Sequence, residues 1–361
     1  MRVLSLVPHR LGHAPGQRGS IELWTRVLSP AGIEVVNAPF ETERLREILY
    51  APGHTLEKVC EMARGMVERL RLTRALDDYD AVFIYREAAL LGPALIERFV
   101  AKKKPIIYQL DDPLFVPYRS PSNGAFSYLK FFGKVKEIIK MSTVVMVNST
   151  PIRQFAEQYN KNIFQVPSVV DTDKFVYDPA DQQRRPVTVG WTGSPTTLRN
   201  VKMVEGPLQQ ISANDDCRIR LIGTGDFGLD GVRYEGVPWR AETEVSDLRQ
   251  IQIGLVPLPD DNPWNPYKFI MKTAQYMALG IVPIGTPMAS NLEVIRPGEN
   301  GFLASTPTEW VEHIRTLTSD HVLRETMSAA GAAEATTKYS LKGNAETIVR
   351  AFRAAVSPAS V

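Results

Sequence analysis

Over the first half of the chain, short runs of β-branched and aliphatic residues alternate with longer stretches in which apolar residues recur every three or four positions. The short runs predict strands, and the longer recurrence predicts amphipathic helices. The expected strands cover residues 2–7, 32–38, 80–86, 105–110 and 143–149, and the expected helices lie near 20–28, 57–76, 92–103 and 127–141. Strands that alternate with helices favour a parallel sheet covered by helices on both faces.

A polar, turn-rich stretch at residues 169–186 then interrupts the pattern, as linkers between domains do. Beyond it the alternation restarts, with strands expected at 186–191, 218–223, 253–258 and 281–286, and helices at 199–212, 242–250, 266–280, 306–317, 320–338 and 343–356. We therefore expect an α/β protein with two Rossmann-like domains that face each other across a cleft. The predicted boundaries are 1–175 for the first domain, 176–338 for the second, and 339–361 for a closing helix and tail.

Composition narrows the class of protein. The 361 residues suffice for two cores, and 44% hydrophobic and 23% charged residues are typical of globular proteins. A net charge of +2 is too small to indicate a nucleic-acid partner. Cys60 and Cys217 lack metal-ligand spacing, and we expect reduced thiols in separate domains. The apolar run within residues 1–10 is too short for a signal sequence, and no stretch reaches the ~20 apolar residues of a spanning helix, so we expect a cytoplasmic protein.

Ligands of open α/β sheets bind beyond the carboxyl ends of the strands, so the loops that follow strands are where a site is expected. Five such loops carry suitable side chains, at residues 12–20, 111–118, 191–199, 223–228 and 259–268. In one of them, Gly193 and Ser194 precede a helix. A small-residue turn at a helix start presents backbone N–H groups that can hold phosphate. A plain turn whose Ser or Thr caps the helix would have the same sequence.

The stretch KFIMKTAQYMALGIVPIG places Lys268, Lys272 and Gln275 on one face of a helix expected to begin near Pro266. Two cations in the first two turns oppose the helix dipole. Their presence is understandable if an anion such as a diphosphate binds there. The alternative is a solvated face on which the lysines pair with the acidic residues at 260–261.

Asp111 and Asp112 directly follow the strand expected at 105–110. Carboxylates at that edge can accept hydrogen bonds from sugar hydroxyls or hold a metal ion. An Asp that only opens a loop before proline is the alternative. Because neighbouring side chains of a strand point to opposite faces, we expect at most one of the two to line the cleft.

Three further segments are candidates with an open interpretation. The segment Gly16–Ser20 lacks the GxGxxG spacing of dinucleotide sites, and either folds over a ligand or forms a mobile surface loop. The segments GTGDFG and GVPW can frame a slot for a base with Trp239 as one wall, unless Trp239 is a core residue. Residues 127–140 combine lysines with apolar side chains, as in a helix that rests on anionic lipid or in an ordinary core helix.

The second half resembles the GT-B glycosyltransferases of the retaining, family-4-like "group 1" class. The resemblance rests on pieces in family order between residues 166 and 304: VPSVVDTDKF, VGWTGSPTT, LIGTG, GVPW, IGLVPLPD and YKFIMKTAQYMALGIVPIGTPMASNLEVIRPGENGFLA. The first half matches only loosely. The family's paired glutamates fall on Tyr267 and Gln275, so neither carboxylate is present, whereas Glu293 is kept in what we expect to be a structural role.

The resemblance implies a site for a nucleotide-diphosphate sugar. The diphosphate would lie between Gly193–Ser194 and the two lysines, the ribose near Gln275, and the base near Gly223 and Trp239. The implied catalytic set is Asp111, Asp112, Lys268 and Lys272, and the implied donor-binding set is Gly19, Gly193, Ser194, Arg199, Gly223, Trp239, Tyr267, Gln275 and Glu293. Asp111 or Asp112 stands where many relatives carry an active-site histidine.

The resemblance further implies a GT-B fold in which residues 1–175 form the acceptor domain and residues 176–338 the nucleotide-sugar donor domain, with a C-terminal helix that crosses back to the first domain. The implied activity is hexosyl transfer from a UDP- or GDP-sugar to a glycan, lipid-linked or small-molecule hydroxyl, with retention, in bacterial-type polysaccharide or glycoconjugate synthesis. No metal, cofactor or nucleic acid is expected, and contact with the inner membrane face would suit a lipid-linked acceptor. A sugar-nucleotide epimerase of similar fold, or a non-catalytic sugar-nucleotide-binding paralogue, is the alternative.

Overall fold

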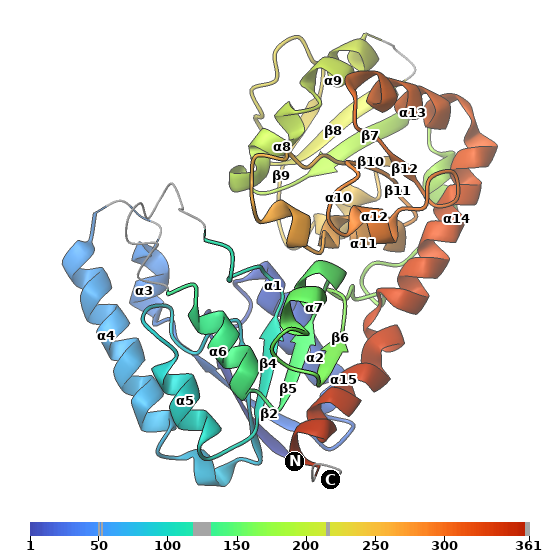
Figure 1. Cartoon of the computed structure of the whole chain (residues 1–361). Coiled ribbons are helices and arrows are strands. Elements are labelled where there is room, and N and C mark those ends of the chain that lie inside the picture. The colour runs from blue at the N-terminus through green and yellow to red at the C-terminus, as the bar shows by residue number, and fades with distance from the viewer. Residues whose placement is uncertain (50, 52, 118–130, 214–216, 358–361) are drawn as a thin grey trace. The chain divides into compact units, whose positions relative to one another are not determined.

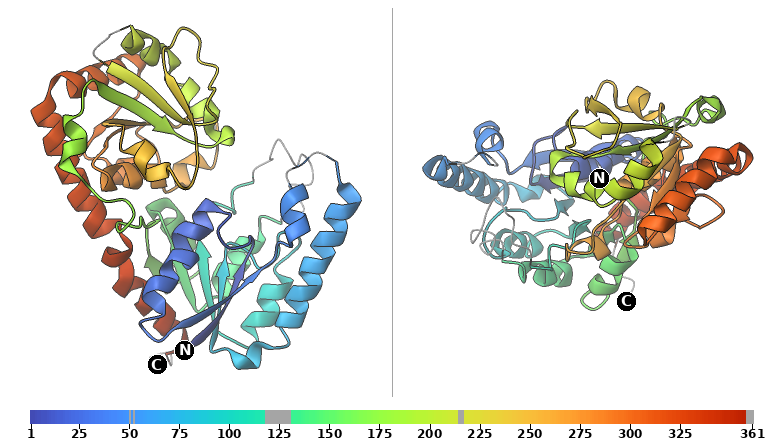
Figure 2. Two further views of the ribbon diagram at one scale, coloured as in Figure 1. Left: turned by 180° about the vertical axis from the view of Figure 1, so that it is seen from behind. Right: turned by 90° about the horizontal axis from the view of Figure 1, so that it is seen from above.

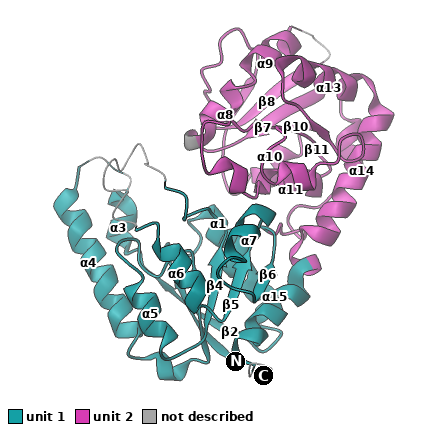
Figure 3. Ribbon diagram, viewed as in Figure 1, with its two compact units in different colours: residues 1–168, 344–361 teal, residues 169–343 magenta. Residues whose placement is uncertain are grey.

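The computed structural model describes residues 1–49, 51, 53–117, 131–213 and 217–357 of the chain. The chain forms two compact units, of which unit 1 comprises residues 1–168 and 344–361, and unit 2 comprises residues 169–343 (Figure 3). Each unit contains its own parallel six-stranded sheet. The expected α/β fold with two Rossmann-like domains is therefore present, and each unit is described separately.

Unit 1 is built on strands in the spatial order β2-β1-β3-β4-β5-β6, all parallel. The strands are β1 (Arg2–Val7), β2 (Glu34–Pro39), β3 (Ala81–Tyr85), β4 (Ile106–Leu110), β5 (Val144–Val147) and β6 (Ile163–Gln165). Every residue of β3, β4 and β5 is buried, because a parallel sheet is covered by helices on both faces. Because these strands are parallel, their carboxyl ends meet at one edge of the sheet, where a site is expected.

The helices of unit 1 lie on both faces of this sheet (Figure 1). They are α1 (Pro15–Gln17) with a π-helical turn (Arg18–Glu22), α2 (Leu23–Leu28), α3 (Glu43–Ile48), α4 (Thr55–Leu72), α5 (Leu95–Ala101), α6 (Lys134–Met141), α7 (Thr150–Ala156) and α15 (Leu341–Val356), with a 3-10 turn at Leu76–Asp78. Of the helix expected over 127–141, the described part begins only at Lys134, and residues 127–130 lie outside the described residues.

The C-terminal helix α15 crosses back to unit 1, as expected. Its Phe352 ring stacks on Phe83 of β3 at a centroid distance of 5.5 Å, and Trp24 of α2 packs edge-on against the same ring at 6.3 Å. Arg353 Nη2 also donates to the Ala31 carbonyl at 3.1 Å. Helices from the two ends of the chain therefore cover the same strand, and the view from behind shows α15 in red and α2 in blue (Figure 2).

Unit 2 is built on strands in the order β12-β11-β10-β7-β8-β9, also all parallel. The strands are β7 (Val187–Thr192), β8 (Cys217–Gly223), β9 (Glu235–Pro238), β10 (Ile253–Val256), β11 (Val282–Gly285) and β12 (Phe302–Leu303). The helices are α8 (Leu198–Lys202), α9 (Glu205–Ser212), α10 (Glu244–Leu248), α11 (Met271–Ala278), α12 (Asn291–Val294), α13 (Pro307–Ser319) and α14 (His321–Lys338), with 3-10 turns at Pro179–Gln183, Pro195–Thr197 and Asn265–Tyr267.

Local sequence explains where several of these helices begin and end. Thr306 and Glu309 form a capping box that satisfies the free N–H groups at the start of α13. Asp320 caps α14 by accepting a hydrogen bond from the Leu323 N–H at 2.9 Å. Gly280 follows α11 with a φ of +75°, the left-handed conformation that terminates helices and that glycine adopts without strain. The starts of α13 and α14 and the end of α11 are thus set by residues close to them in the chain.

Candidate functional site

The loop after β7 is shaped by the aromatic side chain that precedes it. Trp191 is buried, and its indole packs against the backbone of Gly193 so closely that a Cβ atom at Gly193 would overlap the ring. The Gly193 N–H donates to the Ile222 carbonyl at 2.9 Å, which fixes the loop against β8. Ser194 follows and is exposed. Glycine is therefore required where the chain leaves β7, and a small polar residue faces solvent beside it.

Lys272, the second residue of α11, brings a cation to this loop. Its Nζ lies 4.6 Å from the centroid of the Trp191 ring, which is a cation–π contact. Burial and, to a smaller extent, the neighbouring Lys268 lower the pKa of Lys272 to about 8. One turn later the Tyr276 hydroxyl accepts a hydrogen bond from the Thr192 N–H at 3.0 Å. The start of α11 is therefore joined directly to the end of β7.

The prediction that Lys268 and Lys272 begin one helix is wrong. The chain forms a 3-10 turn over Asn265–Tyr267, passes through Lys268 in an extended conformation, and enters α11 three residues later. Ser290 explains the interruption, because its N–H donates to the Lys268 carbonyl at 3.2 Å and its hydroxyl accepts from the Ile270 N–H at 2.7 Å. These bonds replace those of a continuous helix, so helical spacing does not set the placement of Lys268 relative to Lys272.

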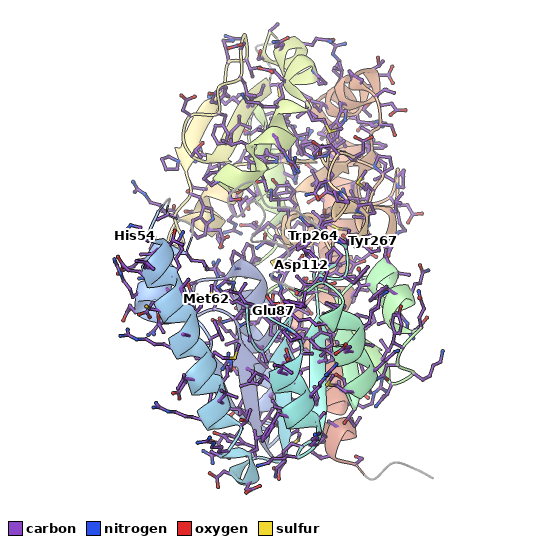
Figure 4. All side chains as sticks on the ribbon, turned by 60° about the vertical axis from the view of Figure 1, so that its left-hand side comes forward. His54, Met62, Glu87, Asp112, Trp264 and Tyr267 are labelled. Carbon is purple, nitrogen blue, oxygen red and sulfur yellow. The ribbon has the colours of Figure 1, made fainter. Side chains whose placement is uncertain are left out.

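Tyr267 and Gln275, which stand where the resembling family keeps glutamates, lie on either side of Lys272 in the chain. Tyr267 ends the 3-10 turn, and its N–H donates to the Trp264 carbonyl at 3.1 Å. Figure 4 labels Trp264 and Tyr267. Gln275 lies on α11, one turn after Lys272, and the side chains of Tyr267 and Gln275 are both half-buried. Neither position supplies a negative charge to offset the lysines.

Gly223 and Trp239 continue the site along the carboxyl edge of the unit 2 sheet. Gly223 ends β8, and a Cβ atom there would lie 2.5 Å from the Gly193 carbonyl oxygen. The Trp239 N–H donates to the Gly223 carbonyl at 2.8 Å. The Trp239 side chain is 39% exposed, and its indole N–H donates to Glu244 at 3.4 Å. The alternative that Trp239 is a core residue is therefore wrong: its backbone is joined to the end of β8 and its side chain is partly exposed.

Two residues of the implied donor set are engaged elsewhere or face solvent. Arg199, on the surface of α8, pairs with Asp261 at 3.3 Å. Asp261 was one of the acidic residues that the sequence suggested as partners of Lys268 and Lys272. In the structure it forms an ion pair with Arg199. Glu293 is exposed on α12. The residues that the structure does bring together in unit 2 are Gly193, Lys272 and, along the edge, Gly223 and Trp239.

In unit 1, Asp111 and Asp112 both bind Arg86, which directly follows β3. Arg86 Nε donates to Asp111 Oδ1 at 2.6 Å and Nη2 to Oδ2 at 2.9 Å, while Nη2 also lies 2.7 Å from Asp112 Oδ2. The Tyr85 hydroxyl donates to Asp111 Oδ2 at 2.6 Å. Both carboxylates contact Arg86, but Asp111 is the more buried, with a side chain 8% exposed against 23% for Asp112. β4 ends at Leu110, so the alternation of a strand does not extend to them, and the expectation that at most one of them lines a cleft stays a prediction.

The glycine-bracketed segment after β1 is folded into this cluster by Gly16. A Cβ atom at Gly16 would lie 2.6 Å from the Tyr85 hydroxyl and 3.0 Å from Arg86 Nη2. Gln17 is fully buried and bonds both the N–H and the carbonyl of His9. Gly19 belongs to the π-helical turn and is half-buried. The mobile surface loop that the sequence left open is therefore not what this segment forms.

Sequence reasoning missed three residues that shape these regions. Trp191 sits in a buried strand and has the pattern of an ordinary core residue. Ser290 lies in a turn far along the chain from the backbone groups it binds. Arg86 could have been found, because it follows a predicted strand directly, as Asp111 follows another, and the rule that sites lie beyond strand ends applies to both.

The lipid hypothesis for residues 127–140 is not supported by burial of the described part. Val135, Ile138 and Ile139 are buried in the core, as the alternative of an ordinary core helix requires, and Lys134 is buried too. Among the residues that the structure describes, no helix combines the length and the apolarity needed to cross a membrane.

No protein-family model matches the chain. No curated protein matches it either. Solved structures do match: sucrose-phosphate synthase from Thermosynechococcus elongatus has a TM-score of 0.71 at 14% identity and covers 98% of both chains. HepE from Anabaena, in complex with UDP and glucose, has a TM-score of 0.66 at 14% identity and covers 98% of this chain and 99% of its own.

A glycosyltransferase from Rickettsia africae gives a TM-score of 0.68 at 13% identity, over 99% of each chain. At such low identity these likenesses establish the architecture alone. The matched proteins are GT-B glycosyltransferases, and their two α/β units correspond to the two units described above. The chain therefore has the GT-B fold.

Proposed function

We propose that the chain is a glycosyltransferase that moves a sugar from a nucleotide-diphosphate sugar to a hydroxyl acceptor. The observation that carries the proposal is the position of Lys272 over the Trp191 ring at the end of β7, the same ring that packs on the backbone of Gly193. Here a helix start, a glycine turn and a cation meet at the carboxyl edge of a parallel sheet, which is where α/β proteins bind phosphates. That HepE, a protein of this fold, was crystallised with UDP and glucose supports a nucleotide sugar as the ligand.

In the proposed reaction the bond between the anomeric carbon and the diphosphate oxygen breaks, and the acceptor hydroxyl oxygen bonds to that carbon. The electron pair of the broken bond stays on the diphosphate, and the hydroxyl proton passes to the departing diphosphate oxygen. Lys272, Lys268 and the backbone N–H groups around Ser194 would stabilise the growing negative charge. Such stabilisation is often worth several kcal/mol, on the order of 3 for one donor. We propose retention by attack on the face that the diphosphate leaves, as the resemblance implies.

The finer assignments are part of the same proposal. The donor is a UDP- or GDP-sugar, with the base beside Trp239 and the ribose beside Gln275. Neither a metal nor a further cofactor takes part, because the lysines supply the positive charge. The acceptor is a glycan, a lipid-linked sugar or a small molecule in bacterial-type polysaccharide or glycoconjugate synthesis. The protein acts in the cytoplasm, with peripheral membrane contact if the acceptor is lipid-linked.

The test is nucleotide binding followed by turnover. Titration calorimetry with UDP and GDP on the full chain should give binding to one of them, weakened about tenfold or more by Lys272→Ala, since each 1.4 kcal/mol lost is tenfold. Lys202→Ala, an exposed lysine of α8 in the same unit, is the matched control and should leave affinity unchanged. The proposal fails if neither nucleotide binds, or if Lys272→Ala binds as tightly as the unaltered protein.

The absence of acids at Tyr267 and Gln275 favours one second candidate, a binding protein without turnover. A panel of UDP- and GDP-sugars separates the candidates when products are followed by mass spectrometry and NMR. Release of nucleoside diphosphate with a new glycoside supports transfer. Binding of an intact nucleotide sugar without turnover supports the non-catalytic protein, and an inverted sugar centre on an intact diphosphate supports an epimerase.

A further inference from the structure

The segment that follows β3 in unit 1 is held by buried charged side chains from three different helices. Arg69 of α4 donates from Nε to the Ala88 carbonyl at 2.7 Å. Glu97 of α5 accepts from the Ala88 N–H at 3.0 Å, and Lys134 of α6 donates to the Ala89 carbonyl at 2.9 Å. All three side chains are at most 5% exposed. Burying a charge is costly unless it is well bonded, so this segment is rigidly fixed where it leaves the sheet.

The rigid segment begins with Arg86, which has a left-handed backbone. Its φ is +63°, a strained conformation for a non-glycine residue that persists only where the surroundings impose it. Its N–H donates to the Gln109 carbonyl at 2.9 Å, and its carbonyl accepts from the Tyr108 hydroxyl at 2.8 Å. Its guanidinium lies 4.9 Å from the centroid of the Tyr85 ring. Backbone and side chain of Arg86 are therefore both fixed.

Arg86 treats its two carboxylates differently. Asp111 accepts hydrogen bonds from Nε and Nη2 of Arg86 and from the Tyr85 hydroxyl, and its side chain is 8% exposed. Asp112 receives a single nitrogen of Arg86, and its side chain is 23% exposed. Asp111 is thus the buried anchor of the guanidinium, whereas Asp112 is the more exposed of the two carboxylates, and solvent and ligands can reach it. Figure 4 labels Asp112 and, on the segment after β3, Glu87.

Two buried amide oxygens at the same edge lack a hydrogen-bond donor among the described residues. They are Oε1 of Gln109, in β4, and Oδ1 of Asn148, directly after β5, and the two side chains are 4% and 5% exposed. Leu110 pairs with Val147 in the parallel ladder, so Asp111 and Asn148 are the next positions along adjacent strands. Buried acceptors are nearly always satisfied in native proteins, so this edge is suited to a ligand that donates hydrogen bonds.

We propose that Arg86 is a positioning residue that holds the Asp112 carboxylate to receive a hydroxyl of a neutral, polyhydroxylated acceptor at the carboxyl edge of the unit 1 sheet. This rests on the proposed function, because it assigns the acceptor's place in the same reaction. An anionic acceptor group against Asp112 would face a like charge. Arg86 and Lys134 are ion-paired within the group, the latter with Glu87 at 2.7 Å, so neither is directed at an anion.

The acceptor class can be tested without any nucleotide. The full chain is applied to an array of neutral, phosphorylated, sulfated and carboxylated glycans, and the strongest neutral ligand is then titrated against variants. Asp112→Asn should weaken that ligand about tenfold or more, the loss typical of a charge-assisted hydrogen bond of about 1.5–3 kcal/mol. The matched control is Asp78→Asn, an exposed Asp in the turn before β3, at the opposite edge of the sheet. If the protein binds only anionic glycans on the array, or binds none, the proposal of a neutral acceptor is overturned.

The positioning role is tested by a double-mutant cycle. Arg86→Ala should weaken the neutral ligand nearly as much as Asp112→Asn, and the double variant should be no weaker than Asp112→Asn alone, because Arg86 acts through that carboxylate. Arg86→Lys should recover part of the loss. Arg98→Ala removes an exposed arginine paired with Glu137 and is the control. Losses that multiply in the double variant would show that Arg86 only supports the fold, and would overturn the positioning role.

These results stay separate from the fate of the proposed function. Nucleotide affinity is measured on the same variants, and Asp112→Asn should leave the UDP or GDP affinity within about twofold, since that ligand is assigned to unit 2. Neutral-glycan binding that depends on Asp112 but occurs without any nucleotide binding would refute the glycosyltransferase and keep the unit 1 assignment. If the protein binds a nucleotide but Asp112→Asn does not change its glycan binding, the unit 1 assignment is refuted and the proposed glycosyltransferase is kept.

Discussion

The ammonium group of Lys272 lies 4.6 Å from the centroid of the Trp191 ring, and the same indole packs on the backbone of Gly193. One aromatic side chain thereby fixes both the cation and the glycine turn that are assigned to the diphosphate.

Nucleotide affinity should fall as the pH rises through about 8. Burial and the neighbouring Lys268 lower the pKa of Lys272 to about 8, and a bound diphosphate favours the protonated lysine. Binding therefore takes up a proton above that pH, and affinity should weaken by up to about tenfold per pH unit there. Calorimetry of UDP or GDP binding between pH 6.5 and 9.5 measures this. Lys272→Arg should remove the decline, and a decline that persists in Lys272→Ala would contradict the assignment.

Lys272 should also make the nucleotide-free protein more stable as the pH rises, which is the opposite of its effect on nucleotide affinity. The pKa of Lys272 is lower in the folded chain than the ordinary value of 10.5, so between about pH 8 and 10.5 the unfolded chain binds more protons. The contribution of Lys272 to the free energy of unfolding therefore becomes more favourable as the pH rises through that window. Urea unfolding of the unaltered protein and Lys272→Met across this range should differ in slope in that direction.

Gly193→Ala should abolish nucleotide binding, because the added Cβ would overlap the Trp191 indole and displace the turn or Lys272 above the ring. Gly206→Ala is a matched control, since a Cβ there meets no atom within 4 Å and the residue lies in α9. The control should be as stable as the unaltered protein or more stable by about 0.5–1 kcal/mol. Nucleotide affinity and urea unfolding of both variants decide the matter. Full affinity in a folded Gly193→Ala protein would refute a close contact of the diphosphate with this turn.

Ser290→Ala should loosen the segment that carries Lys268. The change removes the acceptor of the buried Ile270 N–H, and an unsatisfied buried donor costs about 1–3 kcal/mol. We expect lower stability together with weaker nucleotide affinity, because Lys268 would no longer be fixed. Ser319→Ala, at an exposed helix end, is the control for loss of a hydroxyl. A protein that loses stability but binds nucleotide unchanged would show that Ser290 supports only the fold.

Transfer should continue without divalent metal ions. In the proposed reaction the charge of the leaving diphosphate is balanced by lysines and backbone N–H groups, which act without a bridging cation. Turnover of the best nucleotide sugar is measured after treatment with EDTA, and with Mg²⁺ or Mn²⁺ added back. Loss of turnover that the added metal restores would contradict this part of the proposal.

The regular elements were largely predictable because their periodicity is local. Buried strands such as β3 and β4 read as continuous apolar runs, and long helices such as α14 show recurrent apolar positions. The strands β6, β9 and β12 and the short helices α1, α3, α7 and α12 were not predicted. Strands of two to four residues at the edge of a sheet carry too little pattern to be distinguished from loops.

The candidate site was predictable where it depends on strand ends, and unpredictable where it depends on contacts between distant segments. That Gly193 and Asp111 directly follow buried strands is visible in the sequence. That Lys268 leaves the helix is not, because a serine 22 positions later satisfies its carbonyl. That Asp111 and Asp112 meet one guanidinium depends on how β3 and β4 end side by side.

The sequence by itself determined two parallel sheets covered by helices, because apolar periodicity and turn residues act over a few positions of the chain. The tertiary structure alone decided which side chains meet at the ends of the strands. Trp191 beneath Lys272 and Arg86 between two carboxylates are contacts of this second kind. Their geometry comes from packing between strands and helices far apart in the chain, for which the local pattern carries no signal.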